Sequence, residues 1–240
     1  LDAAGKPAFY LKVKGTVLAV EGRAVKYLFA VALFCLFLFI HQCATAISRK
    51  VPVLGWLFLL LVLTAAHLAV EKFGWPDFVG RWQLFDPHYY ASPQIANSLG
   101  ELLINILMAA WAVLFFYNKV TGEALKDKSW KVRTPVAAAA FLTLLWFSRV
   151  VVNVFQSLVI DSNMSFDINN FLTLDVFSFV GLGGIAMMLI SYFLFTRKVT
   201  NILMENISQT GERAAGVLSG IVIYLVLLLF YPFGTLDVLL

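Results

Sequence analysis

Charged residues and cysteines are scarce in this 240-residue sequence. Charged residues make up 13% of the chain, about half of their usual share in soluble globular domains, and hydrophobic residues make up 61%. This composition excludes an ordinary soluble domain and indicates a membrane protein, with the lipid bilayer as a partner. The 18 basic and 14 acidic residues leave a net charge of +4, which is too small to indicate a nucleic-acid partner.

The sequence also lacks the motifs of a metal or catalytic site. Cys35 and Cys43 lie in one apolar run, about 12 Å apart along a helix, so they cannot form a disulfide bond within it. No HExxH, CxxC or GxSxG motif is present. The GLGG of residues 181–184 lies inside an apolar run and lacks the strand and the lysine of a phosphate-binding loop. We therefore predict no catalytic residue, no metal site and no cofactor, and whether the parent protein is an enzyme stays open.

Six apolar runs are long enough to cross a bilayer, which takes roughly 20 residues as a helix. The predicted fold class is therefore an all-α polytopic membrane protein, with residues 25–240 forming a transmembrane helical bundle. A seventh helix is expected beyond Leu240, because six spans would leave both ends on one side. The runs cover residues 25–47, 52–70, 97–117, 135–160, 171–196 and 214–233.

The positive charges between the runs predict an orientation. Two cations follow the first run, five lie within residues 118–133 and three lie within residues 197–213, whereas residues 161–170 contain none. Because cytoplasmic loops carry the excess of lysine and arginine, we expect the N-terminus outside. The five cations of residues 6–26 argue for the opposite orientation, although a translocated domain crosses largely regardless of its charge.

Residues 1–24 are expected to be the end of an extracytoplasmic segment. Residues 8–20, AFYLKVKGTVLAV, are rich in β-forming residues and alternate in part between apolar and polar side chains, with Gly15 where a turn or bulge would fall. We predict a short β segment there. A disordered leader is the alternative.

The connection at residues 71–96 is rich in aromatic residues, which favour the boundary between membrane and water. Asp86 and Pro87 suit the N-cap and the first position of a short interfacial helix. We predict that this outer interfacial loop anchors the protein, and a lid that contacts a ligand is the alternative. The candidate residues of the loop are Trp82, Asp86, His88 and Tyr89.

Polar residues inside the apolar runs are functional candidates, because an ionisable group at membrane depth costs a few kcal/mol. Arg149 lies roughly 16 Å from the outer end of its predicted helix and therefore needs an internal partner, for which Glu101 and Asp175 are the candidates. Such a cluster could fix helix packing, sense a ligand or a proton, or belong to a transport pathway. The predicted intramembrane polar cluster comprises Arg149, Glu101, Asp175, Asn153, Gln156 and Asn105.

Small residues in the last two runs predict close helix packing. Gly216 and Gly220 form a GxxxG pattern, and Gly181 and Gly184 are spaced by three positions. Residues of this size let two helix backbones approach each other in a membrane.

Two stretches carry a family resemblance: LFDPHYYASPQIANSLGELLINILMAAW, residues 84–111, and DSNMSFDINNFLTLDVFSFVGL, residues 161–182. They resemble the multi-helix membrane sensor region of a group of large bacterial sensor histidine kinases. The resemblance implies a bacterial inner (cytoplasmic) membrane, an extracytoplasmic domain before residue 1, and kinase domains beyond residue 240. The phosphoacceptor histidine box, the Asn box and the glycine-rich ATP lid are absent from this chain.

The leading functional hypothesis is therefore a membrane-embedded sensory region that relays an extracytoplasmic or intramembrane stimulus by helix rearrangement. Its expected partners are an unknown small molecule or protein as the stimulus and a second copy, as a homodimer through the parent protein. A small-solute or ion transporter or channel is the alternative, although the runs show no internal repeat.

Overall fold

The computed structural model describes residues 23–74, 79, 82–92, 95–123, 129–160, 176–206 and 210–230. The chain divides into two units, Leu1–Leu38 and Phe39–Leu240, and the boundary falls inside the first helix. The described part of the first unit is helical, and most of its large hydrophobic side chains are exposed. The elements discussed below belong to the second unit.

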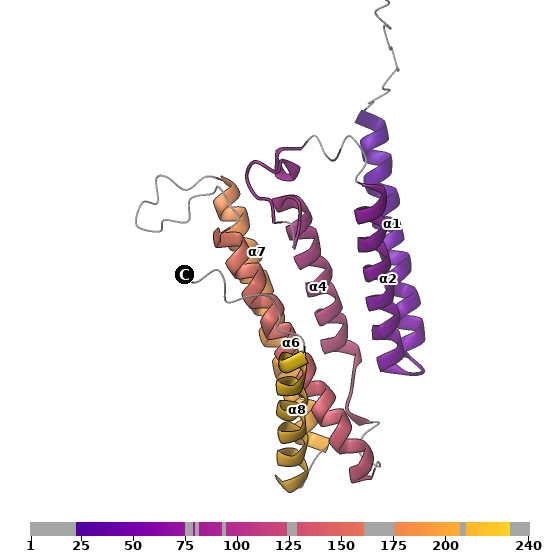
Figure 1. Cartoon of the computed structure of the whole chain (residues 1–240). Coiled ribbons are helices and arrows are strands. Elements are labelled where there is room, and N and C mark those ends of the chain that lie inside the picture. Colours follow the sequence, from indigo (N-terminus) through magenta and orange to yellow (C-terminus); the bar gives the residue numbers. More distant parts are fainter. Residues whose placement is uncertain are drawn as a thin grey trace, which may run out of the picture. The chain divides into compact units, whose positions relative to one another are not determined.

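The described residues are almost entirely helical (Figure 1). Their only pairing of β type is an isolated bridge between Ser92 and Ala96. The elements are α1 (Arg23–Ser48), α2 (Pro52–Phe73), the 3₁₀ helix η1 (Gln83–Phe85), α4 (Leu99–Lys119), α6 (Trp130–Ile160), α7 (Val176–Asn206) and α8 (Thr210–Phe230).

The all-helical class is confirmed for the described residues, and the described part of each predicted apolar run, apart from residues 97 and 98, falls on one of the long helices. Five helices, α1, α2, α4, α6 and α7, are long and apolar enough to cross a membrane. The apolar part of α8 found among the described residues, Ala214–Val226, is shorter than a span. A sixth span therefore stays a prediction, and the predicted β segment at residues 8–20 lies outside the described residues.

Local sequence signals explain several helix ends. Pro52 begins α2, where its missing N–H costs no hydrogen bond. Gly74 ends α2 at a φ of 75°, a conformation that residues with a Cβ rarely adopt. Ser98 caps α4, and its side chain accepts a hydrogen bond from the backbone N–H of Glu101.

The prediction of a short helix after Asp86 is wrong. Residues 87–89 form a turn, and the 3₁₀ helix η1 ends before Asp86. Asp86 Oδ1 accepts a hydrogen bond from the backbone N–H of His88 at 2.9 Å. This side chain therefore closes a tight Asx turn, a bonding pattern that aspartate uses in turns as well as at helix starts.

Ring contacts fix the register of the central helices. Phe147 of α6 lies against Tyr192 and Phe195 of α7, with ring centroids 5.7 and 5.5 Å apart, and Phe195 lies 5.1 Å from Phe116 of α4. Nearer the start of α7, a Cβ at Gly184 would lie 3.0 Å from Leu103 of α4. Helices α4 and α7 therefore run in the same direction. Helix α6 runs opposite to both, because Ser157 near its end is hydrogen-bonded to Tyr90 in the segment that precedes α4.

This register defines two ends in the second unit. At the capped end, named for residues 82–98, α2 and α6 finish and α4 and α7 begin. At the basic end, α4 and α7 finish and α2 and α6 begin; the cations there include Arg49, Lys131 and Arg197.

Glycines mark the closest helix approaches. A Cβ at Gly55 of α2 would lie only 2.6 Å from the Ala44 carbonyl oxygen of α1. In α8, a Cβ at Gly216 would lie 2.7 Å from Ala137 and one at Gly220 would lie 2.7 Å from Phe141, both on α6. This is the close approach that a GxxxG pattern predicts. In α7, Gly181 and Gly184 are both buried.

Candidate functional site

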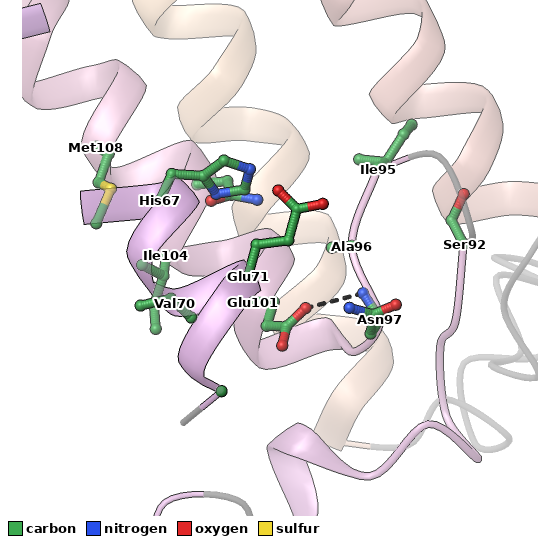
Figure 2. A pocket seen from close by; sticks show the side chains of 12 residues that line it. His67, Val70, Glu71, Ser92, Ile95, Ala96, Asn97, Glu101, Ile104 and Met108 are labelled. Carbon is green, nitrogen blue, oxygen red and sulfur yellow. Dashed lines mark hydrogen bonds between the residues drawn. The ribbon is translucent and has the colours of Figure 1, made fainter. Parts of the chain in front are cut away.

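A polar pocket of about 270 Å³ lies at the capped end, between α2, the segment before α4, and α4 itself. Figure 2 shows His67 and Glu71 of α2 side by side on its wall, with Glu101 and Asn97 nearby. The pocket is lined by His67, Val70, Glu71, Gly74, Ser92, Ile95, Ala96, Asn97, Glu101, Ile104, Asn105 and Met108.

The lining of this pocket combines hydrogen-bond acceptors with apolar side chains. Two carboxylates, of Glu71 and Glu101, share the wall with the His67 imidazole and the Asn105 amide, and the lining contains no lysine or arginine. Valine, isoleucine and methionine side chains supply the remaining surface. Such a pocket can hold a small ligand that donates hydrogen bonds and has an apolar body, the usual mixture in a small-molecule site.

Glu101 is held in place by a capping arrangement at the start of α4. Its Oε2 accepts a hydrogen bond from the backbone N–H of Asn97 at 2.9 Å, and its own N–H donates to Ser98 Oγ at 3.3 Å. The second bond satisfies a backbone donor that a helix start leaves unpaired, and the first ties the Glu101 carboxylate to the residue before the cap. The sequence signal was the Ser98-Leu-Gly-Glu101 spacing, which is typical of a capping box.

The segment before α4 is anchored among the helices rather than lying loosely on them. Tyr90 is 0% exposed, and its hydroxyl lies 2.7 Å from Ser157 Oγ of α6 in a hydrogen bond. The neighbouring Tyr89 ring lies 4.1 Å from the Phe177 ring of α7. The Phe85 ring lies against Gly100 of α4, where a Cβ would come within 2.8 Å of it.

Tyr90 is the residue that sequence reasoning missed. A tyrosine in an aromatic loop next to a membrane span is ordinarily an interfacial side chain, and no local pattern distinguishes Tyr90 from Tyr89. The other predicted loop residues are less buried: Trp82 is 54% exposed, Tyr89 is half-buried, and Asp86 and His88 are exposed around the turn. The loop is thus a packed cap, named here the cap segment (residues 82–98, described except for 93 and 94).

The structure divides the predicted polar cluster. Arg149, Asn153 and Gln156 share one face of α6, as their spacing predicts, but all three side chains are exposed. Glu101 and Asn105 instead line the pocket between α2 and α4. Asp175 lies outside the described residues.

The pairing of Arg149 with Glu101 is not found. Arg149 is about 3 Å along α6 from Phe147, which lies at the level of Phe195 and Phe116. Glu101 lies about 22 Å along α4 from Phe116. Helical spacing showed that the α6 residues share a face, but it carries no information on which way that face turns or on the register between helices.

The basic end holds a second polar pocket, of about 310 Å³, between the end of α4 and the end of α7. Lys198 lies over the ring of Tyr117, with Nζ 5.5 Å from the ring centroid. Two carboxylates, of Glu123 and Glu205, also line this pocket. The last turns of α4 and α7 therefore both contribute residues to this pocket.

Two tryptophans connect α4 to the first two helices between these pockets. Trp111 Nε1 donates a hydrogen bond to His41 Nδ1 of α1 at 3.3 Å, and Trp56 Nε1 of α2 donates to the Ala112 carbonyl oxygen at 3.1 Å. Trp56 also packs against the Phe116 ring at 4.9 Å. These bonds satisfy indole N–H groups that would otherwise be unpaired in an apolar interior.

Within the part of the chain that the structure describes, no group of three histidine, cysteine, aspartate or glutamate side chains could hold a metal ion. The fold defines a protein with five long apolar helices that suit a membrane, and with polar pockets at opposite ends of α4. No protein-family model, curated protein or solved structure matches this chain.

Proposed function

We propose that this chain is the membrane-embedded sensory region of a larger bacterial sensor histidine kinase, and that the pocket at the capped end receives the stimulus. The observation that carries the proposal is the buried bond between Tyr90 and Ser157, which joins the cap segment to α6. The resemblance of residues 84–111 and 161–182 to such sensor regions supports the same function. In this proposal the N-terminus is extracytoplasmic, and the capped end faces the outside of the inner membrane.

The cap segment offers a physical route from the pocket to the helices. Ser92 and residues 95–97 form one wall of the pocket, Tyr90 lies just before that wall, and α4 begins just after it. A ligand that moved this wall would therefore displace both α4, which follows the wall in sequence, and α6, which is bonded to Tyr90. A sensor requires only that the ligand prefer one of two such packings, since its differential affinity then shifts their populations.

The effect at the far side would appear where α4 and α7 finish. The rings of Phe116 and Phe195 connect these two helices, and the Lys198 ammonium lies over Tyr117 one turn further on. A shift of α4 relative to α7 would change these contacts. In a homodimer of the parent protein, that change would reach the kinase domains expected beyond residue 240.

A transporter is the second candidate, because the chain has a polar pocket at each end of α4. A transport path would have to join them between Met108, the deepest α4 residue of the first pocket, and Tyr117 of the second. The packed Trp56 and Phe116 rings and the Trp56 bond to Ala112 occupy that stretch. This packing favours the sensor over the transporter.

Glu101→Gln in the full-length parent protein tests the proposal. Glutamine still offers an oxygen to the Asn97 N–H, so the helix cap should persist, whereas the negative charge of the pocket is removed. Basal autophosphorylation in membrane vesicles should rise or fall severalfold, a change within the usual 1 to 3 kcal/mol range of allosteric coupling, roughly 5- to 150-fold. Ser219→Ala, a polar-to-alanine change in α8, is the control and should leave autophosphorylation unchanged.

Reconstitution into liposomes separates the two candidate functions. The sensor predicts no saturable flux of ions or small solutes through the wild-type chain. Saturable flux that Glu101→Gln abolishes would contradict the sensor and support the transporter. If Glu101→Gln leaves autophosphorylation unchanged, the pocket does not take part in signalling.

A further inference from the structure

The last turns of α1, residues 39–48, belong to the second unit, and they contact α4 through the half-buried imidazole of His41. Its Nδ1 accepts a hydrogen bond from Trp111 Nε1 at 3.3 Å. These two rings are also stacked, with centroids 6.1 Å apart and an interplanar angle of 24°. The Phe115 ring meets the imidazole at 86°, with centroids 5.6 Å apart. A titratable side chain therefore packs directly against two aromatic rings of α4.

The hydrogen bond between His41 and Trp111 can form only while His41 is neutral. An indole N–H is a donor only, so the nitrogen that faces it must carry a lone pair. Protonation places a hydrogen on both nitrogens of the imidazole, so two donors would then face each other and the bond would be lost. Histidine side chains ordinarily change charge between pH 5 and 8. The bond is therefore present at the higher pH and is lost as the pH falls.

Thr45 offers a hydrogen-bond partner to the protonated ring. It lies four positions after His41, on the same face of α1, and its hydroxyl oxygen is buried without a hydrogen-bond partner among the described residues. A buried hydroxyl that lacks a partner destabilises the state in which it occurs. An imidazolium that turns along α1 can donate to this oxygen. Each charge state of His41 therefore has its own partner, Trp111 for the neutral ring and Thr45 for the charged ring.

The surroundings of this contact on α2 and α4 are apolar. A buried cluster formed by Ala44, Leu59, Leu63, Ala112 and Phe115 lies there, with the Trp56 and Trp111 rings packed against it. Cys43 is two positions from His41, about 200° around α1. A pH change in this range therefore acts on the contact between α1 and α4 through His41. The other titratable and charged groups in or just after these parts of α1, α2 and α4 lie nearer to the helix ends: Arg49, Lys50, His67, Glu71, Lys72, Glu101, Tyr117 and Lys119.

We propose that His41 is a proton-binding site that couples the pH at the basic end to the packing of α1 against α4. His41 lies about 10 Å along α1 from Ser48, where the helix finishes at the basic end. In the neutral state, the bond to Trp111 holds the last turns of α1 against α4. When His41 binds a proton, its ring turns to Thr45 and these turns separate from Trp111. This response goes beyond the proposed function, because it requires no ligand in the pocket at the capped end.

Spin labels on both helices test this proposal in the full chain, with no ligand added. The labels are attached at Ala46→Cys in α1 and Leu114→Cys in α4, both exposed positions, after Cys35 and Cys43 have been replaced by alanine. Lipid nanodiscs expose both sides of the membrane to one buffer, and electron–electron distance distributions are measured at pH 8 and pH 5. The population at the longer distance should rise about fivefold at pH 5, the shift expected from the loss of one hydrogen bond.

Two variants should abolish the pH response for different reasons. In His41→Gln the side chain does not titrate and still offers an oxygen to the indole N–H, so the distribution at both pH values should match that of the wild type at pH 8. In Trp111→Phe the donor is absent, so both pH values should give the same distribution, with a larger population at the longer distance. His88→Gln removes an exposed imidazole of the cap segment, and this control should keep the full response.

Two results would overturn the proposal. Identical distributions of the wild-type chain at pH 8 and pH 5 would show that protonation of His41 does not change this packing, and that measurement depends on no substitution of His41. A pH response that persists in His41→Gln would assign the response to a different group. Both results are independent of ligand binding at the capped end, which Glu101→Gln tests separately.

Discussion

Tyr90 and Ser157 are separated by 67 positions in the sequence and share one buried hydrogen bond. Tyr90→Phe removes the hydroxyl while keeping the ring, so it should lower the free energy of unfolding by about 1 kcal/mol, the usual range for such bonds in proteins and membranes. Titration with sodium dodecyl sulfate in mixed micelles measures this quantity. Tyr89→Phe is the matched control and should change little, because Tyr89 is half-buried and contacts Phe177 through its ring.

The Tyr90 prediction has an internal check. If the bond exists, Ser157→Ala should cost less in the Tyr90→Phe background than in the wild type, because the bond is already lost. Additive effects of the two substitutions would show that these side chains do not interact.

Gly55 is a second residue at which a small substitution should change the stability of the fold, because there is no room for a Cβ atom. A Cβ at this position would meet backbone atoms of Ala44 and Ser48 within 2.6 to 2.8 Å, and backbone cannot move aside as a flexible side chain can. Gly55→Ala should therefore destabilise the α1–α2 hairpin by about 1 to 3 kcal/mol, the range for overpacking. The measurement is the same detergent titration.

Gly183→Ala is the control for Gly55→Ala, since no atom lies within 4 Å of the added Cβ. Alanine at that position should be neutral or stabilise α7 by up to about 1 kcal/mol, because alanine has the higher helix propensity. A larger loss at Gly183 than at Gly55 would contradict the packing described for both glycines.

At the scale of single residues, sequence spacing predicted which residues share a helix face, but not which residues of other helices they contact. The spacing of Arg149, Asn153 and Gln156 predicted their common face correctly, yet the same spacing fits a face turned inward or outward. Glu101 was assigned to a membrane-buried pair although its Ser-x-x-Glu spacing already indicated a helix cap. A local hydrogen bond is encoded in four consecutive residues, whereas a contact between helices depends on register, which no single helix encodes.

At the scale of elements, apolar run length predicted helix positions well. The runs at 52–70 and 97–117 correspond to α2 (Pro52–Phe73) and α4 (Leu99–Lys119), because roughly 20 apolar residues can satisfy their backbone groups in a bilayer only as a helix. The cap segment was predicted less well. Its aromatic residues pack against Gly100, Ser157 and Phe177, which lie on three different helices.

The pairing of α8 with α6 depends on two glycines. Gly220→Leu would press a branched side chain against Phe141 and the Ala138 backbone, so α8 should separate from α6 along its length. A spin label at the exposed Val222 should then become more mobile. Gly211→Leu is the control, because no atom lies within 4 Å of a Cβ there, and its label mobility should equal that of the wild type. Unchanged mobility in Gly220→Leu would contradict this pairing.

At the scale of the whole molecule, the orientation rests on the positive charges of the connections. Single cysteines at His88, in the cap segment, and at Lys131, at the start of α6, are both exposed positions. In intact cells and without the two native cysteines, an impermeant thiol reagent should label His88→Cys but not Lys131→Cys. Labelling of Lys131→Cys alone would reverse the orientation, and equal labelling of both would contradict a membrane between these positions.

The central claim is that the cap segment at one end of the helices controls the packing of α4 and α7 at the other. Spin labels at Asn118 and Asn201, both exposed near the ends of these helices, report that packing as an electron–electron distance distribution in lipid nanodiscs. Tyr90→Phe, which acts only at the capped end, should redistribute the populations at this distant pair, whereas Tyr89→Phe should reproduce the wild-type distribution. Identical distributions in all three proteins, together with a measured loss of stability in Tyr90→Phe, would show that the cap stabilises the helices without controlling them and would contradict the account.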